Sequence, residues 1–537
     1  MKKAQWKSHA PPRRGTSGAV RSAIAGVPGF RVDERIAQVA EKVLLGIDIG
    51  TASSKGVLVS TDGRIIARAS RPHETSHPHP GWVEHDAESV WWADFLELAR
   101  ELVRAAEGRE IAGLGVSGIG PVLLPADGDG KPLRPAILYG VDTRATEEIA
   151  ELTEEFGADE ILRRGGSALS SQAVGPKIRW LAKHEPERYQ RTEMLLMCSS
   201  YLVHRLTGRY VLDHHSASQC DPLYDLQARD WSADWAQRVA PGLPLPELAW
   251  PTEVVGRVTA QAAAETGLPE GLPVTAGTVD AWAEATSVGV REPGDVMLMY
   301  GTTMFFVQVL TDVQPHPALW GTCGAFPDTY TLAAGMATSG AVTQWLRGLV
   351  DGDFAQLVEK ASKVPAGSRG LLLLPYFAGE RTPIFDPDAR GVLAGLTTSH
   401  GRAELYRAAL EGIGFGVRHN LAAMGEAGGT ARRLVAVGGG TQGGLWTQIV
   451  SDITGQEQQI PAETVGAAYG NALLAGLGTG AAVAPEAWNP VTRTVRPNPE
   501  HTERYNGFFR HYRDLYDSTV RIAHFLAGEQ RAADERD

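Results

Sequence analysis

The chain has 537 residues, of which 43% are hydrophobic, and its formal net charge is -12 at pH 7. This length exceeds what a single hydrophobic core supports, so we expect two large domains. The acidic balance excludes nucleic acid and anionic membranes as main partners, because both are recognised through dense clusters of Lys and Arg.

Residues 1–42 are basic, contain scattered Pro, Gly and Ser, and show no regular hydrophobic period. They lack the continuous apolar stretch of a secretory signal. Two interpretations stay open, a disordered extension and a misassigned start. In either case we expect the folded chain to begin at Val43.

A β-meander is predicted directly after this point. The run VLLGIDIG is almost continuously apolar and ends in Gly, which is typical of a buried strand. KGVLVS and RIIARAS follow, and the Asp-Gly dipeptide between them is a strong turn signal. Apolar residues at spacings of three and four then predict an amphipathic helix over 87–107. A further strand is expected over 111–116.

The same pattern returns later in the chain. DVMLMYGTTMFFVQVL, at 295–310, is an apolar run, a Gly-Thr-Thr turn and a second apolar run, which predicts an internal duplication. A strand over 330–334 would complete the second meander, and VTQWLRGLV should form a helix after it. Strands that alternate with helices in both halves imply two mixed α/β lobes.

The boundary between the two lobes is expected at 289–294, after the predicted helix AWAEATSVGV. The first lobe then covers 43–288 and the second covers 289–528, with 529–537 left as a tail. Aromatic and aliphatic residues at helical intervals predict a helix over 500–528, packed on the second lobe.

Two turns offer groups that suit phosphate. The first, at 50–55, follows a buried strand and presents backbone N–H groups and hydroxyls, while Asp48 before it could hold Mg²⁺. The second is at 301–303. A plain Gly-rich turn is the alternative for either one alone. Two matched turns in duplicated lobes can grip one triphosphate from opposite sides, and no Walker P-loop occurs in the chain.

Two other patterns are set aside. GLGVSG, at 113–118, matches the dinucleotide fingerprint, but Ile-Gly-Pro follows where a helix would have to start. We expect these glycines to leave room for a ligand instead. Four nearby histidines have irregular spacing and intervening prolines, so we expect a solvated loop and not a metal site. These are His73, His77, His79 and His85.

Asp280 begins a predicted helix directly after an apolar stretch. An Asp at this position can cap the helix by accepting from backbone N–H groups. It can also act as a general base that takes a hydroxyl proton during phosphoryl transfer in a cleft between lobes. From this residue alone both roles stay open.

Several segments together resemble the FGGY family of carbohydrate kinases, which includes glycerol kinase, xylulokinase and ribulokinase. GIDIGTASSKGVLV and GTTMFF are similar to the two phosphate loops of that family, and GTVDAWAEA to its catalytic-Asp segment. HPHPGWVEHDAESVWW resembles its Gly-Trp-x-Glu segment, and SGAVTQWLR and GGGTQGGLWTQIVSDITG resemble its nucleotide segments. GVLAGLTTSHGRAELYRAALEG fits the second FGGY signature throughout.

This resemblance implies a two-lobed actin-like ATPase fold, which is ribonuclease H-like, and phosphorylation of a sugar or polyol by ATP. It makes Asp280 the general base and Asp48 a Mg²⁺ ligand. The residues implied to bind the ATP phosphates are Thr51, Ser53, Lys55, Gly301, Thr302 and Thr303. Those implied to line the nucleoside pocket are Gly340, Gln344, Gly439, Gly440 and Gly443.

The expected sugar pocket departs from the family's pattern. Ile119 and Gly120 stand where members commonly carry a polar pair such as Met-His or Arg-Glu, and Ala281 stands where Asn or Gln often follows the catalytic Asp. The remaining candidates for sugar contacts are Trp82, Glu84, Gly120, Tyr139, Asp142 and Arg144. The last two could equally form a structural ion pair. The family favours a pentulose such as xylulose or ribulose, but the missing groups leave the substrate open.

Two other functions share this nucleotide core, namely an actin- or chaperone-like ATPase and a sugar-binding sensor without turnover. Asp280 and the second signature favour the kinase, and dependence of ADP production on added polyol would separate the three. Three widely spaced cysteines form neither a disulfide framework nor a zinc site, and no apolar run approaches the roughly 20 residues of a membrane span. We expect a cytoplasmic protein, and a homodimer stays open.

Overall fold

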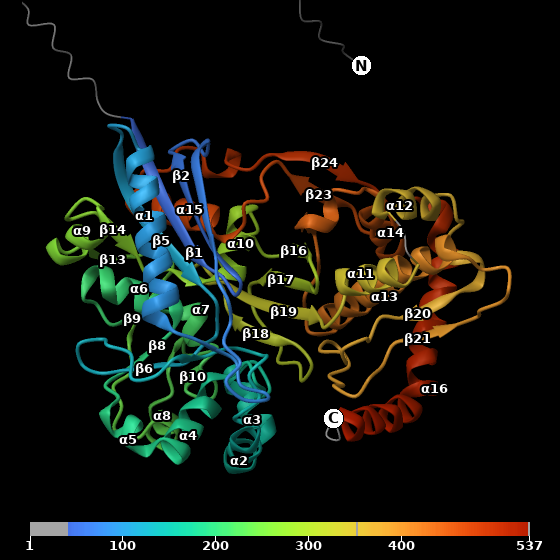
Figure 1. Ribbon diagram of the computed structural model, residues 1–537, viewed down its shortest axis with the longest axis horizontal. Coiled ribbons are helices and arrows are strands. Elements are labelled where there is room, and N and C mark those ends of the chain that lie inside the picture. The colour runs from blue at the N-terminus through green and yellow to red at the C-terminus, as the bar shows by residue number, and fades with distance from the viewer. Residues whose placement is uncertain (1–40, 351–352, 535–537) are drawn as a thin grey trace, which may run out of the picture. The chain divides into compact units, whose positions relative to one another are not determined.

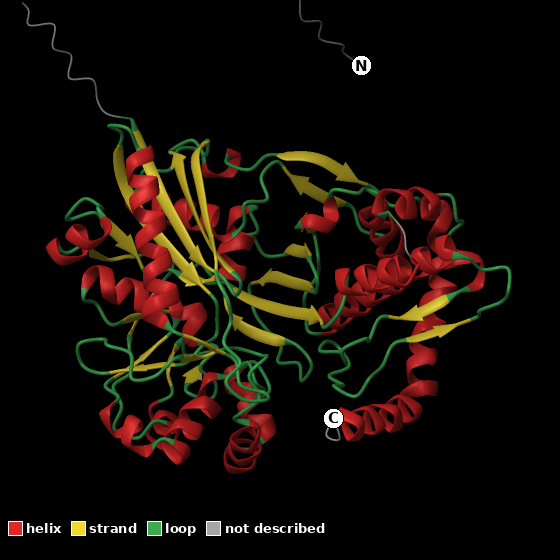
Figure 2. Cartoon of the chain, viewed as in Figure 1, coloured by secondary structure: helices red, strands yellow, loops and turns green. Residues whose placement is uncertain are grey.

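The computed structural model describes residues 41–350 and 353–534. The predicted N-terminal extension therefore lies outside the described residues except for its last two, and Lys42 is already the first residue of a strand. Two mixed sheets of seven strands each organise the described residues (Figure 1; Figure 2). Within this part of the chain, no helix combines the length and apolar character that a membrane span requires.

The first sheet contains the predicted meander. Its strands, in spatial order, are β13 (Val254–Arg257), β14 (Pro273–Thr275), β5 (Glu110–Gly118), β1 (Lys42–Ile49), β2 (Ser53–Ser60) and β3 (Ile65–Pro72), with β15 (Thr278–Val279) also paired to β5. β1 is antiparallel to β2 and parallel to β5. All residues of β1 after Lys42 are buried, because helices cover both faces of the sheet, which confirms the buried-strand prediction.

The second sheet repeats this plan. Its strands, in spatial order, are β18 (Trp320–Cys323), β19 (Tyr330–Met336), β17 (Met304–Leu310), β16 (Asp295–Tyr300), β22 (Arg433–Val437), β23 (Gln458–Pro461) and β24 (Val491–Val495). β16 is antiparallel to β17 and parallel to β22, as β1 is to β2 and β5. The sequence did not predict β18, which precedes β19 and pairs with its outer edge.

Five short two-stranded sheets complete the strands of the described residues: β4 (Glu84–His85) with β7 (Ala136–Ile137), β6 (Leu124–Ala126) with β8 (Met194–Leu196), β9 (Val211–Asp213) with β12 (Glu247–Ala249), β10 (Tyr224–Asp225) with β11 (Asp230–Trp231), and β20 (Leu372–Leu374) with β21 (Val392–Ala394). They hold together the long connections that follow β3, β5 and β19.

The α-helices in the first half of the chain are α1 (Ala93–Ala105), α2 (Thr146–Phe156), α3 (Ala158–Gly165), α4 (Val174–His184), α5 (Pro186–Arg191), α6 (Cys198–Thr207), α7 (His214–Ala217), α8 (Ala233–Val239), α9 (Ala260–Thr266) and α10 (Asp280–Ser287). Those in the second half are α11 (Gly340–Val350), α12 (Phe354–Ser362), α13 (Arg402–Glu426), α14 (Leu445–Thr454), α15 (Ala467–Thr479) and α16 (Thr502–Asp534). The helix predicted over 87–107 begins with a π-helical turn, Ala87–Trp92, before α1. The predicted helix end at residue 528, with a tail after it, is wrong over the described residues, because α16 continues to Asp534.

Helix α15 lies in sequence between β23 and β24 of the second sheet but packs on the first, where Figure 1 shows it in red beside the blue strands. A Cβ atom added at Gly46 would lie 1.9 Å from the carbonyl oxygen of Ala468, and one at Gly115 would lie 2.1 Å from that of Asn471. Only glycine allows this approach. The expectation that the glycines of 113–118 leave room for a ligand is therefore wrong, because α15 and, at Gly118, the side chain of Cys198 fill the space.

Replacing Gly470 of α15 by Ala is expected to destabilise the fold by at least about 2 kcal/mol, the usual scale of overpacking. The added Cβ atom would lie 1.8 Å from the carbonyl oxygen of Ala283 on α10, so the two helices would have to separate. Urea unfolding measures the change. Gly425→Ala is the matched control, because it lies in α13 with nothing within 4 Å of its new Cβ atom. Equal unfolding midpoints for both variants would contradict the close packing of α10 on α15.

Candidate active site

A cavity of about 350 Å³ is lined by residues of both sheets and of the segments between them. The first phosphate turn, the start of α10 and the second turn all contribute to its wall. The predicted site residues that line it are Asp48, Thr51, Ser53, Lys55, Gly120, Tyr139, Asp280 and Thr303. These residues are far apart in the sequence. Their predicted roles are to bind metal, phosphate and sugar and to accept a proton, and all of them line one cavity.

Asp48 is fixed by the register of the first sheet. It lies opposite Lys55 of β2 and beside Ser117 of β5, whose Oγ donates a 2.7 Å hydrogen bond to Asp48 Oδ1. Burial raises the pKa of the Asp48 carboxyl, while Ser117 and Lys55 work in the opposite direction. The carboxylate is therefore held rigidly but keeps oxygen capacity for a further cation.

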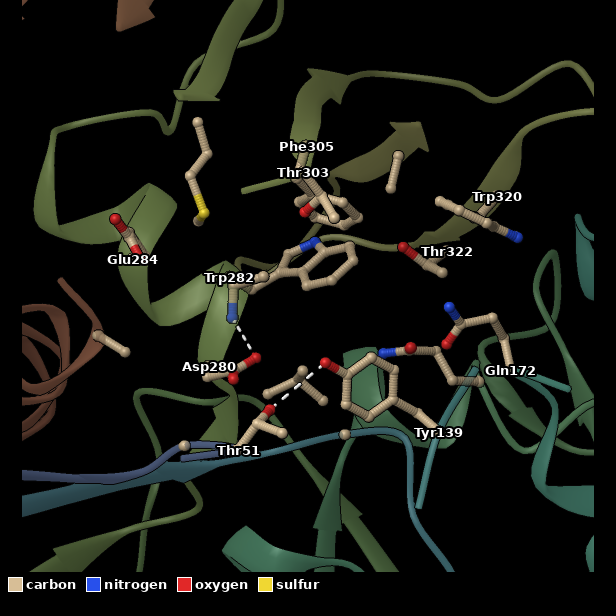
Figure 3. Close-up of a pocket in the computed structure, with 18 of the residues that line it drawn as sticks. Thr51, Tyr139, Gln172, Asp280, Trp282, Glu284, Thr303, Phe305, Trp320 and Thr322 are labelled. Atoms are coloured by element: carbon tan, nitrogen blue, oxygen red, sulfur yellow. Dashed lines mark hydrogen bonds between the residues drawn. The ribbon is translucent and has the colours of Figure 1, made fainter. Parts of the chain in front are cut away.

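Asp280 is the first residue of α10, and its Oδ1 accepts from the backbone N–H of Ala281 at 2.7 Å (Figure 3). Burial raises the pKa of the Asp280 carboxyl well above its usual value, and the negative charges of Asp48 and Glu284 add to this shift. The bond to Ala281 satisfies only one of the carboxylate oxygens. Asp280 is not the capping residue of α10, since Val279 holds that position, and the side chain of Asp280 lines the cavity.

Glu284 also lines the cavity, although it is not among the residues predicted from the sequence. Burial, together with the nearby Asp48, raises the pKa of Glu284 to about 7. The signal was present, because a residue four positions after Asp280 lies on the same face of a helix. Asp48, Asp280 and Glu284 make one end of the cavity acidic.

Tyr139 lies across from the first phosphate turn. Its hydroxyl is 3.4 Å from Thr51 Oγ1, and Figure 3 shows both groups beside Asp280. Burial raises the pKa of Tyr139, and the charge of Asp280 contributes to the shift. The phenol therefore stays protonated and can donate to an oxygen in the cavity.

Two of the four histidines have buried side chains, which corrects the solvated-loop interpretation for them, and one of these, His73, supports the first phosphate turn. His73 Nδ1 lies 2.8 Å from Asp94 Oδ2, and His73 Nε2 lies 3.1 Å from the carbonyl oxygen of Gly50. Burial works against the charged form, but Asp94 outweighs it and the pKa of His73 is raised. The side chain of His85 is buried too, whereas His77 and His79 are exposed.

The second phosphate turn is held by the start of α11. The N–H groups of Gly340 and Ala341 donate to the carbonyl oxygens of Gly301 and Thr302, at 3.0 and 3.1 Å. Gly440 approaches the same place, because a Cβ atom there would lie 2.9 Å from Tyr300 Cβ. The structure thus brings Gly301, Gly340 and Gly440 together at the end of β16. The predicted residues of this group that lie outside the cavity lining are Gly301, Thr302, Gly340, Gln344, Gly439, Gly440 and Gly443.

Four predicted sugar-binding residues form a buried ionic cluster outside the cavity. Arg144 Nη2 lies 2.6 Å from Asp142 Oδ2, and Arg144 Nη1 lies 2.8 Å from Glu84 Oε1. The Arg144 guanidinium also stacks 3.9 Å from the ring centre of Trp82. Arg134 forms a further ion pair with Glu84. Asp142 and Arg144 thus form the structural ion pair that the sequence left open. None of the four residues lines the cavity, and their contacts with a sugar stay a prediction.

Other side chains line the cavity. An aromatic wall is formed by Trp282, Phe305 and Trp320, with Phe305 and Trp320 near parallel (Figure 3). The polar side chains that line the cavity without having been predicted include Gln172, Gln219, Asp221, Thr322 and Arg381. Gln219, Asp221, Thr322 and Arg381 lie outside the segments that resemble family motifs, so the resemblance did not select them.

Comparison with known proteins is decisive for the class. The model of the N-terminal domain of the FGGY family of carbohydrate kinases matches residues 43–287, and that of the C-terminal domain matches residues 296–479. The chain belongs to the FGGY family of carbohydrate kinases. It is therefore a phosphotransferase, and the kinase prediction is confirmed over the actin- or chaperone-like ATPase.

The relatives of this chain include kinases that are named for different substrates. The chain is 30% identical to a xylulose kinase of Escherichia coli (strain K12), over 80% of this chain and 89% of the relative. It is 32% identical to a glycerol kinase of Nocardia farcinica, over 86% of this chain and 96% of the relative. The crystal structure of a xylulose kinase from Rhodospirillum rubrum matches with a TM-score of 0.85 and 33% sequence identity. The match covers 90% of this chain and 100% of that structure's chain. The predicted actin-like ATPase fold is confirmed.

Proposed function

We propose that this kinase transfers the γ-phosphoryl group of ATP to a hydroxyl of a pentulose, with xylulose as the first candidate. The observation that supports this best is Asp280, a carboxylate with a raised pKa in a cavity that Thr51 and Thr303 of the two phosphate turns also line. Relatives named xylulose kinase cover most of the chain. The aromatic wall suits the C–H faces of a sugar.

Asp280 would act as the general base. As the substrate oxygen forms its bond to the γ-phosphorus, the bond from that phosphorus to the bridging oxygen of ADP breaks, and the hydroxyl proton passes to the Asp280 carboxylate. A raised pKa brings the base closer to the working pH and makes it a better proton acceptor. The Tyr139 hydroxyl can orient the substrate or phosphate oxygens beside it.

Asp48 and Glu284 fit Mg²⁺, because carboxylate oxygens are the ligands it prefers. The described residues contain no group of three or more side chains arranged to hold a metal ion by themselves. This agrees with an ion that is bound by one or two carboxylates together with nucleotide phosphates. When bound, Mg²⁺ would neutralise phosphate charge that the acidic end of the cavity would otherwise repel.

Arg381 is proposed to stabilise the phosphoryl group during transfer. It lines the cavity, its Nη2 donates to the Met336 carbonyl at 3.0 Å, and its buried Nε has no partner among the described residues. The adjacent Glu380 does not neutralise it, since burial raises the pKa of Glu380 to about 8. A guanidinium without a counter-charge suits an anionic group.

An ADP-release assay tests the proposed function with xylulose, ribulose, glycerol, tetritols and gluconate. We expect the highest kcat/KM for a pentulose and no more than background ADP formation without an acceptor. ADP formation that ignores the added sugar, or a preference for glycerol over both pentuloses, would refute the assignment.

The Mg²⁺ concentration needed for half-maximal rate is expected to fall as the pH rises from 6 to 8. Glu284, whose pKa is about 7, is protonated in the lower part of this range and cannot hold a cation until it loses its proton. Glu284→Gln should flatten this dependence, which steady-state rates over a Mg²⁺ series at each pH would measure. Glu270→Gln, at an exposed site, is the control. An unchanged pH dependence in Glu284→Gln would remove Glu284 from the metal site.

A further inference from the structure

The segment that follows α7 presents two polar side chains to the cavity, Gln219 and Asp221. We call them the acceptor pair. Gln219 is partly exposed, whereas Asp221 is only 4% exposed. The segment is anchored through its backbone, because the N–H groups of Val174 and Gly175 at the start of α4 donate to the carbonyl oxygens of Gln219 and Asp221. Both side chains therefore project from a fixed main chain.

His215 sets the orientation of the Gln219 amide. His215 Nδ1 lies 2.9 Å from the carbonyl oxygen of Cys323, which can only accept, so Nδ1 carries the hydrogen. Burial lowers the pKa of His215 to about 3, so the ring is neutral and Nε2 is an acceptor. Gln219 Nε2 lies 2.7 Å from it and donates. With its NH₂ group engaged, Gln219 has its amide oxygen left to face the cavity.

Asp221 has no such engagement. Its Oδ1 is buried without a hydrogen-bond partner among the described residues, and it fits against Gly165, where a Cβ atom would lie 2.1 Å from it. The buried Lys177 has no hydrogen bond to it among the described residues, because Lys177 Nζ donates to the carbonyl oxygens of Ser171 and Ala173. Because Gly165 closes off Oδ1, Oδ2 is the oxygen through which Asp221 can reach a ligand in the cavity.

We propose that Gln219 and Asp221 bind hydroxyl groups of the substrate and so select a polyhydroxylated sugar over a short polyol. Gly120 presents no side chain where family members commonly carry a polar group, and the acceptor pair supplies polar groups from another wall of the same cavity. The Trp282 ring stacks 3.7 Å from His215, so the aromatic wall and the acceptor pair are parts of one packed unit. The inference rests on the proposed function, which identifies the cavity as the sugar site.

Calorimetric titration of the full chain with xylulose and with glycerol, without ATP, tests the acceptor pair separately from catalysis. Gln219→Leu removes the acceptor with little change in volume and is expected to weaken xylulose binding at least about 10-fold, the loss expected for one hydrogen bond in a buried site. Glycerol, which has fewer hydroxyls, should be affected less, so the preference for xylulose falls. Asp221→Ala should act in the same direction. Gln261→Leu, on the exposed surface of α9, is the matched control.

The outcomes separate the two proposals. If xylulose binds in a Gln219-dependent way but yields no ADP, the acceptor pair stands and the proposed function fails. If xylulose is phosphorylated and Gln219→Leu keeps its affinity within about 2-fold, the acceptor pair is overturned while the proposed function stands. Should Asp221→Ala fail to fold, Gln219→Leu decides alone, because its side chain is partly exposed. Absence of binding by every sugar of the panel would overturn both.

Discussion

Asp280→Asn is expected to lower kcat at least about 100-fold, within the usual contribution of a general base. The amide cannot take the hydroxyl proton, but its oxygen can still accept the 2.7 Å bond from Ala281 N–H, so the start of α10 should persist. The KM for ATP should stay within about 2-fold, because no phosphate contact is assigned to this side chain. Steady-state ADP release with the preferred sugar measures both quantities.

The same substitution should leave the melting temperature unchanged or raise it. Asp48, Asp280 and Glu284 repel one another in the native state, and Asn removes one of these charges. A carboxyl with a raised native pKa adds most to stability at low pH and loses that contribution as the pH rises through its native pKa. Wild-type stability should therefore fall with rising pH more steeply than that of Asp280→Asn.

Asp159→Asn is the control for both measurements, because Asp159 is exposed in the first turn of α3 and outside the cavity lining. It should match the wild type in kcat and in melting temperature. An Asp280→Asn protein with normal turnover would exclude Asp280 as the base. A large loss of melting temperature would instead show that the carboxylate has a structural role.

The sequence predicted those parts of the fold that depend on local pattern. Continuous burial of β1 and the repeated meander follow from apolar periodicity, which needs no knowledge of distant segments. The packing of α15 on β1 was not predictable in this way, because it depends on where a helix from the second half of the chain crosses the first sheet. Gly46 allows α15 to approach β1 closely at that point, but the sequence shows only that a glycine lies within a strand.

Some residues of the candidate site could likewise be predicted from the sequence, and others could not. Asp48, Thr51 and Asp280 lie next to strand ends or helix starts, where sequence patterns and the family resemblance could locate them. Arg144 shows the limit. An Asp-x-Arg pair has the same sequence whether it contacts a sugar or closes on itself, and only the neighbouring Glu84 and Trp82 decide for the second. Arg381 shows the converse, because its proposed role depends on the raised pKa of the neighbouring Glu380, which burial sets and no sequence pattern gives.

Arg381→Ala should reduce kcat at least about 100-fold, since an arginine aimed at a transferring phosphoryl group typically contributes more than this. The KM for the sugar should change little, because the interaction is proposed to strengthen only as charge shifts to the bridging oxygen. Arg381→Lys should recover part of the loss through its charge but not all of it, because lysine lacks the planar fork. The ADP-release assay with the preferred sugar gives kcat and KM for each variant.

Stability offers a second, independent readout for the same residue. Burial lowers the pKa of Arg381, so the folded protein bears the cost of a desolvated cation that no carboxylate in the described residues balances at hydrogen-bond distance. Arg381→Ala should therefore not lose melting temperature in proportion to its loss of rate, whereas Arg104→Ala, at an exposed position of α1, should alter neither. If Arg381→Ala raises the KM for the sugar and keeps kcat, the guanidinium binds a sugar oxygen and not the phosphoryl group. A side chain that contacts only the transferring phosphate would change kcat and leave the binding of the sugar in the ground state unaltered.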